Sequence, residues 1–169
     1  MRHTDASLVV IRFRIGHTTH QLFRRNQKWN DWSLVGGHME PGEEGMWAKT
    51  AAREVEEEMP GLLHQKDFIL VPILPATVSW GPDISKSANL PTTYTIQYFT
   101  MRFMDHPVKL LSNLPIGEFK LFPEYRVGFN EASTGKPIKV LRETLGGNFS
   151  DVKLSWDDNM PEETGRLWA

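Results

Sequence analysis

Three carboxylates at helical spacing, those of Glu54, Glu57 and Glu58, are the side chains of this sequence best suited to chemistry. Residues at i, i+3 and i+4 project from one side of a helix, where like charges repel by a few tenths of a kcal/mol per pair. Their place in the last helical turns adds about 0.3–1 kcal/mol for each exposed carboxylate, because the helix dipole is negative there. A bound cation would offset both costs.

Clustered carboxylate oxygens suit hard divalent ions. Magnesium in particular is held by a few carboxylates together with phosphate oxygens of a substrate, so the cluster indicates phosphate chemistry. A run of glutamates taken alone is more often a solvated acidic helix face. The flanking sequence decides between these two interpretations.

The segment that carries the glutamates is predicted to be a helix that follows a loop. Residues 46–59 contain no glycine or proline, and Pro60-Gly61 ends the helix. Three glycines and a proline between Gly36 and Gly42 exclude a regular element there. The apolar residues of the helix are spaced as one face: Ala48, Ala52, Val55 and Met59.

The segment Gly36-Gly37-x-x-Glu40-x-Gly42-Glu43, followed by Arg53-Glu54-Val55-x-Glu57-Glu58, resembles the Nudix hydrolase signature. The spacing matches from Gly37 to Glu43 and again from Arg53 to Glu58. It departs in two places: nine residues instead of seven separate Glu43 from Arg53, and one extra residue precedes Gly61. The extra residues enlarge the loop or the first helical turn, so the spacing gives little support to the family's ion pair between Glu43 and Arg53.

Nudix proteins share an α/β/α sandwich in which the signature forms a loop, a helix and a loop. The resemblance therefore implies an α+β fold with a mixed β-sheet. It also implies a pyrophosphohydrolase that cleaves a diphosphate linkage in a nucleoside diphosphate derivative with the help of Mg²⁺ or Mn²⁺. By position in the motif, Glu54, Glu57 and Glu58 are the expected side-chain metal ligands, and the carbonyl of Gly36 is a further candidate.

The resemblance also implies attack of water on phosphorus, for which a carboxylate must accept a proton. Glu57, Glu58 or a glutamate outside the motif would do so, while Arg53 and Glu43 would orient the motif. Glu118 is the preferred outside candidate, because it follows a long strand at a place where family members often carry an acidic residue. The alternative is that Glu118 is an exposed loop residue.

Two other functions stay open. A Nudix-like module that binds a nucleotide without hydrolysing it, and so regulates a partner, is favoured by the altered spacing before Arg53. An acidic helix that mediates protein contacts without metal would leave the glycine loop unexplained. The sequence does not indicate which nucleoside diphosphate derivative is bound, and a homodimer is left open.

Composition predicts one domain, residues 1–169, with a polar tail from 148 to 169 that packs on the domain or on a partner. A formal net charge of −2 gives no general attraction to nucleic acid or anionic membranes. The absence of cysteine excludes disulfides, thiolate metal sites and a cysteine nucleophile. The first apolar stretch is interrupted by Arg12 and Arg14 and is too short to cross a membrane, so we expect a cytoplasmic protein.

Before the motif, residues 7–15 alternate as one strand, a second strand covers about 20–25, and a third, about 32–35, leads into the glycine loop. The basic cluster Arg24-Arg25-Asn26-Gln27-Lys28 is interpreted as a solvated hairpin end in preference to a phosphate contact. His38, in the glycine loop, either approaches phosphate or faces solvent.

After the motif helix, prolines within residues 68–78 predict an edge or bulged strand. Residues 80–91 are predicted to be a loop and a candidate substrate lid. Residues 92–104 form the longest strand, covered on both faces, and 137–145 a second helix. Residues 110–119 are loop-like. Three aromatic residues either stack on a base or, as is more common, belong to the core: Trp80, Tyr94 and Tyr98.

Overall fold

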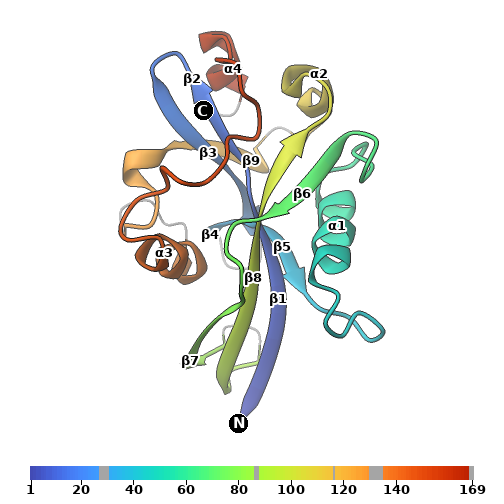
Figure 1. Cartoon of the computed structure of the whole chain (residues 1–169), viewed down its shortest axis with the longest axis vertical. Coiled ribbons are helices and arrows are strands. Elements are labelled where there is room, and N and C mark those ends of the chain that lie inside the picture. Colours follow the sequence, from blue (N-terminus) through green and yellow to red (C-terminus); the bar gives the residue numbers. More distant parts are fainter. Residues whose placement is uncertain (27–30, 86–87, 116, 130–134, 168–169) are drawn as a thin grey trace.

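The computed structural model describes residues 1–26, 31–85, 88–115, 117–129 and 135–167, which form two β-sheets with helices on both sides (Figure 1). In this described part, the larger sheet has five strands and the smaller has four. The strands of the larger sheet are β1 (Arg2–Val10), β5 (Val35–His38), β6 (Phe68–Pro72), β7 (Val78–Ile84) and β8 (Pro91–Phe103). Those of the smaller sheet are β2 (Arg12–Ile15), β3 (Thr18–Asn26), β4 (Asp31–Ser33) and β9 (Phe119–Pro123).

The larger sheet is mixed, because β1 runs parallel to β8 while β5, β6 and β7 pair antiparallel with their neighbours. Its strand order is β5-β1-β8-β6, and β7 pairs with the other end of β8. The helices are α1 (Trp47–Glu58), α2 (Pro107–Leu111), α3 (Gly135–Thr144) and α4 (Glu162–Leu167), with a 3₁₀ turn, η1, at Glu124–Arg126. The predicted α+β fold with a mixed sheet is therefore confirmed.

Two hydrophobic cores hold the layers together. One joins α1 to both sheets through residues such as Val55, Met59 and Phe99, and the other lies beneath α3 around Ile138 and Tyr98. The sequence assigned Tyr98 to either a base-binding site or the core. Its ring is fully buried and its hydroxyl donates to the carbonyl of Pro137 at 2.6 Å, so Tyr98 is a core residue.

The first predicted strand, residues 7–15, is divided between the two sheets. β1 ends at Val10 and β2 begins at Arg12, while Ile11 between them is fully buried. At this break the Arg12 backbone bonds Ser155 instead of another strand: its N–H donates to Ser155 Oγ at 2.9 Å, and its carbonyl accepts from Ser155 N–H at 2.7 Å. The apolar alternation continues across the break, which is why the sequence showed one strand.

The glycine segment is also more regular than predicted. Gly36 and Gly37 lie within β5 and pair with Leu8 and Ser7 of β1. Gly36 has φ +141°, and a Cβ there would lie 2.2 Å from the Ser7 carbonyl oxygen. Glycine therefore permits a close approach of two strands, and the prediction that no regular element forms here was wrong for residues 36–38.

The predicted lid, residues 80–91, begins as strand, and residues 86–87 lie outside the described part of the chain. β7 continues through Ile84 and pairs with the start of β8, so this half of the segment belongs to the sheet. Trp80 of β7 stacks on Tyr94 of β8 with ring centroids 5.4 Å apart, and both rings pack against the second core. The loop prediction was wrong for residues 80–84 because β7 contains proline and glycine, which are normally loop signals.

The predicted third strand, about 32–35, is divided between β4 of the smaller sheet and β5 of the larger sheet. Several other predicted elements are confirmed with shifted ends. The strand at 92–104 is β8, β6 is an edge strand, and the helix at 137–145 is α3, which begins two residues earlier and buries Ile138 and Leu141. The supposed loop 110–119 contains the end of α2 and the start of β9.

The tail from residue 148 packs on the domain. It buries Phe149, Val152 and Met160, and Trp156 packs against the first core. Trp168 lies outside the described residues. In the part of the chain that the structure describes, no helix has the length and apolar character needed to cross a membrane.

Candidate active site

Helix α1 lies against β5 and β1, and this packing sets the direction of its acidic side chains (Figure 1). Ala51, Val55 and Met59 are fully buried beneath the helix, whereas Ala48, predicted to share that face, is exposed. The buried face thus begins one helical turn later than expected. It leaves Glu54 and Glu58 at the edge of the contact with β5, each with a side chain only 15% exposed.

Glu54 and Glu58 meet at the glycine pair of β5. The backbone N–H of Gly36 donates to Glu58 Oε2 at 3.2 Å. A Cβ on Gly37 would lie 2.5 Å from Glu54 Oε1, so only glycine leaves room for this carboxylate. The two carboxyl groups lie near enough for the charge of Glu54 to raise the pKa of Glu58. The motif helix and glycine segment therefore place two oxygen-rich groups together, as the spacing predicted.

Burial alters the protonation of this pair. It raises the pKa of Glu58 to about 8, against the opposing effect of the Arg24 guanidinium, whose Nη1 lies 3.9 Å from Glu58 Oε1. Burial likewise raises the pKa of Glu54. Two carboxylates this close and this poorly solvated resist ionising together, so the pair holds a proton near neutral pH unless another cation is supplied.

Glu57 occupies a different position from the pair. Its side chain is 56% exposed, and Arg53 Nη1 donates to it at 3.3 Å while also contacting Glu54 Oε1 at 3.1 Å. Within the described ranges, no three histidine, aspartate or glutamate side chains converge on one point as a ready-made metal site. The predicted three-carboxylate set is thus represented by a close pair and a third member bound to Arg53.

The ion pair between Glu43 and Arg53 is formed, contrary to the expectation from the altered spacing. Arg53 Nε donates to Glu43 Oε2 at 2.9 Å and Arg53 Nη2 to Glu43 Oε1 at 3.0 Å. Turns around Gly42 and Gly45, with φ of +90° and +73°, take up the extra residues and return Glu43 to the helix. The insertion therefore changes the loop and leaves the contact intact.

Glu43 is well satisfied in this position. Besides Arg53, it accepts from the Thr50 hydroxyl at 3.0 Å and from the Glu40 N–H at 2.9 Å. The hydrogen bonds from Arg53, followed by the one from the Glu40 backbone, lower the pKa of Glu43 to about 2. The Glu43 contact, in turn, raises the pKa of Arg53. Arg53 Nη2 also donates to the carbonyl of His38 at 3.0 Å, so the Glu43–Arg53 pair connects the end of β5 to α1.

Glu118 lies just before β9, beside β3. Its carbonyl accepts from Arg25 N–H at 2.7 Å, and the adjacent Phe119 pairs with Arg24. The side chain is partly exposed, and in the described structure it makes no hydrogen bond or ion pair. Glu118 therefore lies next to β3, the strand that places Arg24 near Glu58. His38, the other loop candidate, is exposed and contacts Arg53 through its backbone only.

Arg24 is the site residue that the sequence interpretation undervalued. Its Nε atom is buried and, among the described residues, has no hydrogen-bond partner, while its Nη1 approaches Glu58. The signal was present in the basic cluster 24–28, which we interpreted as a solvated hairpin end. Residues 27 and 28 of that cluster lie outside the described residues.

Comparisons with known proteins agree with this geometry. The NUDIX domain family matches residues 1–85, which include β1 and the whole of α1. The chain belongs to the Nudix family. No curated protein matches the sequence closely enough to count as a relative.

Solved structures with the same fold include the Ap4A hydrolase of C. elegans, 15% identical, with a TM-score of 0.56 over 86% of this chain and 98% of that chain. A mutT/nudix family protein from Listeria innocua is 18% identical, with a TM-score of 0.53 over 86% of this chain and 92% of that one. Shewanella oneidensis NrtR is 11% identical, with a TM-score of 0.56 over 85% of this chain and 61% of that one. At these identities the likeness concerns the fold.

Proposed function

We propose that this protein is a metal-dependent pyrophosphohydrolase that cleaves a diphosphate linkage in a nucleoside diphosphate derivative by attack of water on phosphorus. The observation that carries the proposal is the placement of the Glu54 and Glu58 carboxylates on the glycine pair of β5. This arrangement presents two carboxylates together, and carboxylate oxygens are ligands that Mg²⁺ and Mn²⁺ prefer.

Glu54, Glu58 and the carbonyl of Gly36 are the groups that would hold Mg²⁺ or Mn²⁺, and Glu57 would join them on release from Arg53. The bound ion would neutralise charge that develops on the phosphoryl oxygens and acidify a bound water. The buried pair fits a cation, because a positive charge would offset both the burial of Glu58 and the repulsion between the Glu54 and Glu58 carboxylates.

The other charged residues of the site would position the reacting groups and balance their charge. Arg53, tied to Glu43, orients Glu57 and the end of β5. Arg24, with its buried and unpaired Nε, would contact a phosphate oxygen of the substrate. Glu57, Glu58 or Glu118 would accept the proton of the attacking water; Glu118 is the candidate beside Arg24.

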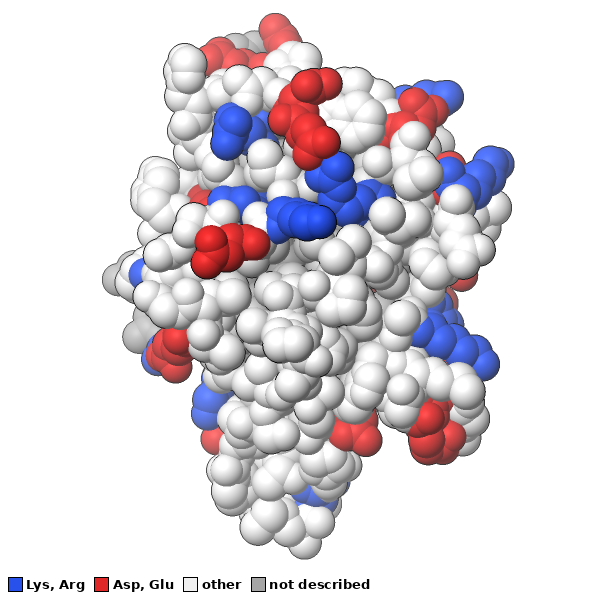
Figure 2. Space-filling model, in the orientation of Figure 1, with Lys and Arg blue, Asp and Glu red and all other residues white. Residues whose placement is uncertain are grey.

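The single domain of residues 1–169 would act on a small molecule, with a homodimer left open. On the face shown in Figure 2, acidic and basic side chains are interspersed, and much of the lower half is uncharged. This mixed surface gives no specific support for nucleic-acid binding. The cysteine-free composition is compatible with a cytoplasmic location, which stays a prediction.

A non-hydrolysing, nucleotide-binding regulatory module is the second candidate. It is favoured by the likeness to NrtR, whose structure was also solved with a 27mer DNA and whose NUDIX domain was solved with ADP ribose. The altered spacing no longer supports this candidate, because the Glu43–Arg53 pair is intact.

The test is a panel of nucleoside triphosphates, nucleotide sugars, dinucleotides and dinucleoside polyphosphates, assayed with Mg²⁺ and with Mn²⁺. We expect metal-dependent release of a nucleotide from at least one class, and its loss in Glu58→Gln. Glu56→Gln is the matched control, because Glu56 lies on the same helix but is exposed and its carboxylate accepts only from His64 N–H in the described structure. Binding without cleavage across the whole panel would instead support the regulatory module.

A further inference from the structure

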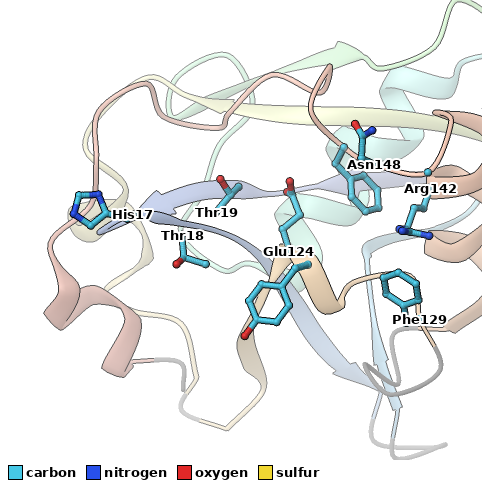
Figure 3. A pocket seen from close by; sticks show the side chains of 10 residues that line it. His17, Thr18, Thr19, Glu124, Phe129, Arg142 and Asn148 are labelled. Atoms are coloured by element: carbon cyan, nitrogen blue, oxygen red, sulfur yellow. The ribbon is translucent and has the colours of Figure 1, made fainter.

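A cavity lies away from the motif helix, at the start of β3 (Figure 3). Its volume is about 560 Å³, within the range of small-molecule sites. The β2–β3 turn, η1, the end of α3 and the loop after α3 form its walls. Thr18 in this wall and Arg24 near Glu58 lie on the same strand six residues apart, or about 20 Å at ~3.3 Å per residue. The cavity is therefore separate from the candidate active site.

The charge of this cavity comes from Arg142. Glu124, the acidic residue in the wall, is already neutralised by Arg12, whose Nε and Nη2 donate to its two oxygens at 2.6 and 2.8 Å. In the described part of the chain, Arg142 forms no ion pair with a carboxylate. The cavity therefore presents one uncompensated positive charge, which favours an anionic ligand.

Arg142 is held in a defined orientation. Its guanidinium lies 3.9 Å from the centroid of the Phe129 ring (Figure 3). Its aliphatic stem crosses Gly128, where a Cβ would lie 2.6 Å from Arg142 Cδ. Stacking covers one face of the guanidinium but leaves the N–H groups at its edge free to donate, and an Arg fork of this kind matches the oxygens of a phosphate.

Other polar groups of the cavity wall can also donate hydrogen bonds. Asn148 uses its carbonyl oxygen to accept from Ser150 N–H at 3.0 Å, so its amide NH₂ is left as a donor. The wall also contains the hydroxyl of Thr19 and the imidazole of His17. A phosphate group, with several acceptor oxygens, complements this set better than a neutral ligand does.

Two aromatic rings complete the cavity. Tyr125 is 72% exposed and Phe129 is 42% exposed, although both belong to the wall. Exposed rings beside a stacked arginine offer flat apolar surfaces against which a planar base can lie.

We propose that this cavity binds a mononucleoside phosphate, with its phosphate on Arg142 and Asn148 and its base against Tyr125. The site is distinct from Glu54 and Glu58, so binding needs no divalent metal and does not depend on the hydrolase proposal. The chemistry that recognises the ligand is a phosphate joined to a planar ring.

The test is titration calorimetry of the full chain with AMP in the presence of EDTA. We expect wild type to bind AMP more tightly than ribose 5-phosphate or adenosine, because each of these lacks one of the two recognised groups. Arg142→Gln should weaken AMP binding at least tenfold, or about 1.4 kcal/mol. Lys139→Gln is the matched control, since Lys139 is exposed on the same helix and outside the cavity wall.

A second variant separates binding from folding. Asn148→Asp retains the oxygen that accepts from Ser150 but replaces the donor NH₂ with negative charge, so it should also weaken AMP binding. Glu58→Gln should leave AMP binding in EDTA unchanged. The assignment is overturned if wild type does not bind AMP at millimolar concentration, if both cavity variants bind normally, or if Glu58→Gln abolishes binding. Equal affinity for AMP and ribose 5-phosphate would overturn the placement of the base on Tyr125.

Discussion

The two ends of the Nudix motif differ in how completely their charges are matched. Glu43 receives hydrogen bonds from Arg53, Thr50 and a backbone N–H, and its pKa falls to about 2. Glu58 is buried beside Glu54 with Arg24 at 3.9 Å, and its pKa rises to about 8. At the Glu43 end, groups of the protein itself balance the charge of the carboxylate. At the Glu58 end the Arg24 charge does not offset the burial of the carboxyl group, and a raised pKa of this kind marks Glu58 as a candidate functional residue.

The largest expected difference between the two ends is in catalysis. Glu58→Gln, and likewise Glu57→Gln, should lower turnover of the substrate found by the panel at least about a hundredfold, or about 2.7 kcal/mol of barrier. Glu43→Gln should lose less, because Glu43 acts only by orienting Arg53 and the motif loop. Turnover is compared at fixed pH and saturating metal. Near-normal rates in all three variants would place catalysis elsewhere.

The glycine pair of β5 allows a second contrast. Gly36→Ala should destabilise the fold by about 2 kcal/mol, because a left-handed φ and a Cβ 2.2 Å from the Ser7 carbonyl strain the β1–β5 pairing. Gly37→Ala should cost less stability, because its Cβ meets only the movable end of Glu54. Instead it should weaken metal binding. Urea unfolding and metal titration of both variants test this; equal unfolding free energies would contradict it.

These glycines also show what the sequence revealed and what it did not. The motif predicted that Glu54 and Glu58 would lie on one side of a helix, and the helical spacing was sufficient for that. It did not predict that Gly36 and Gly37 belong to β5, because the reason lies in a partner strand about thirty residues earlier. Close approach between distant segments leaves no local signal beyond the glycines themselves.

For the fold as well, local sequence signals were sufficient to predict some elements, whereas others depend on contacts with distant segments. Residues 92–104 were predicted correctly, because a long β-branched and aromatic run is a strong local signal. Residues 80–91 were assigned to a lid because prolines and glycine outweighed the apolar residues of β7, which are stabilised by pairing with β8. The importance of Arg24 was missed for a similar reason: only the tertiary fold brings β3 close enough for Arg24 to approach Glu58. In these cases contacts between segments that are distant in the sequence, and not local residue preferences, determine the structure.

Metal binding should stabilise the Glu58 end. A specific site at tenfold excess of metal over its Kd adds about 1.4 kcal/mol to the unfolding free energy. Thermal unfolding with increasing Mg²⁺ or Mn²⁺ should therefore show a rise in Tm in wild type and in Glu56→Gln. The rise should be absent from the double variant Glu57→Gln, Glu58→Gln. An identical response in that double variant would remove these residues from the metal site.

The metal response should also depend on pH. Because the folded pKa of Glu58 is raised, its protonated form stabilises the metal-free protein at low pH, and that contribution is lost as pH rises through about 8. A metal ion binds the ionised carboxylate, so bound metal restores the stability that is lost when Glu58 ionises. The rise in Tm with metal should be larger at pH 8.5 than at pH 6.5, and Glu56→Gln should behave as wild type. A response independent of pH would contradict the raised pKa of Glu58.

The smallest expected effect is at the Glu43 end, and it appears in the opposite pH window. The folded pKa of Glu43 lies below its ordinary value of 4.5, so its ionised form stabilises the protein above that value, and the contribution is lost as pH falls toward 2. Glu43→Gln lacks the carboxylate at every pH. The difference in unfolding free energy between wild type and Glu43→Gln should therefore be greatest near neutrality and narrow from pH 5 to pH 2.

Urea unfolding at several pH values measures this gap, with Glu44→Gln as the control, since Glu44 is exposed in the same loop and accepts only from Gly42 N–H in the described structure. Glu58→Gln should show no such narrowing in acid, because Glu58 is protonated in both folded and unfolded chains well below pH 4.5. Its difference from wild type should change between pH 4.5 and 8 instead. If the differences of both variants from wild type changed in the same pH window, the two ends of the motif would not be electrostatically distinct. The contrast between the Glu43–Arg53 ion pair and the buried Glu54–Glu58 pair would then be wrong.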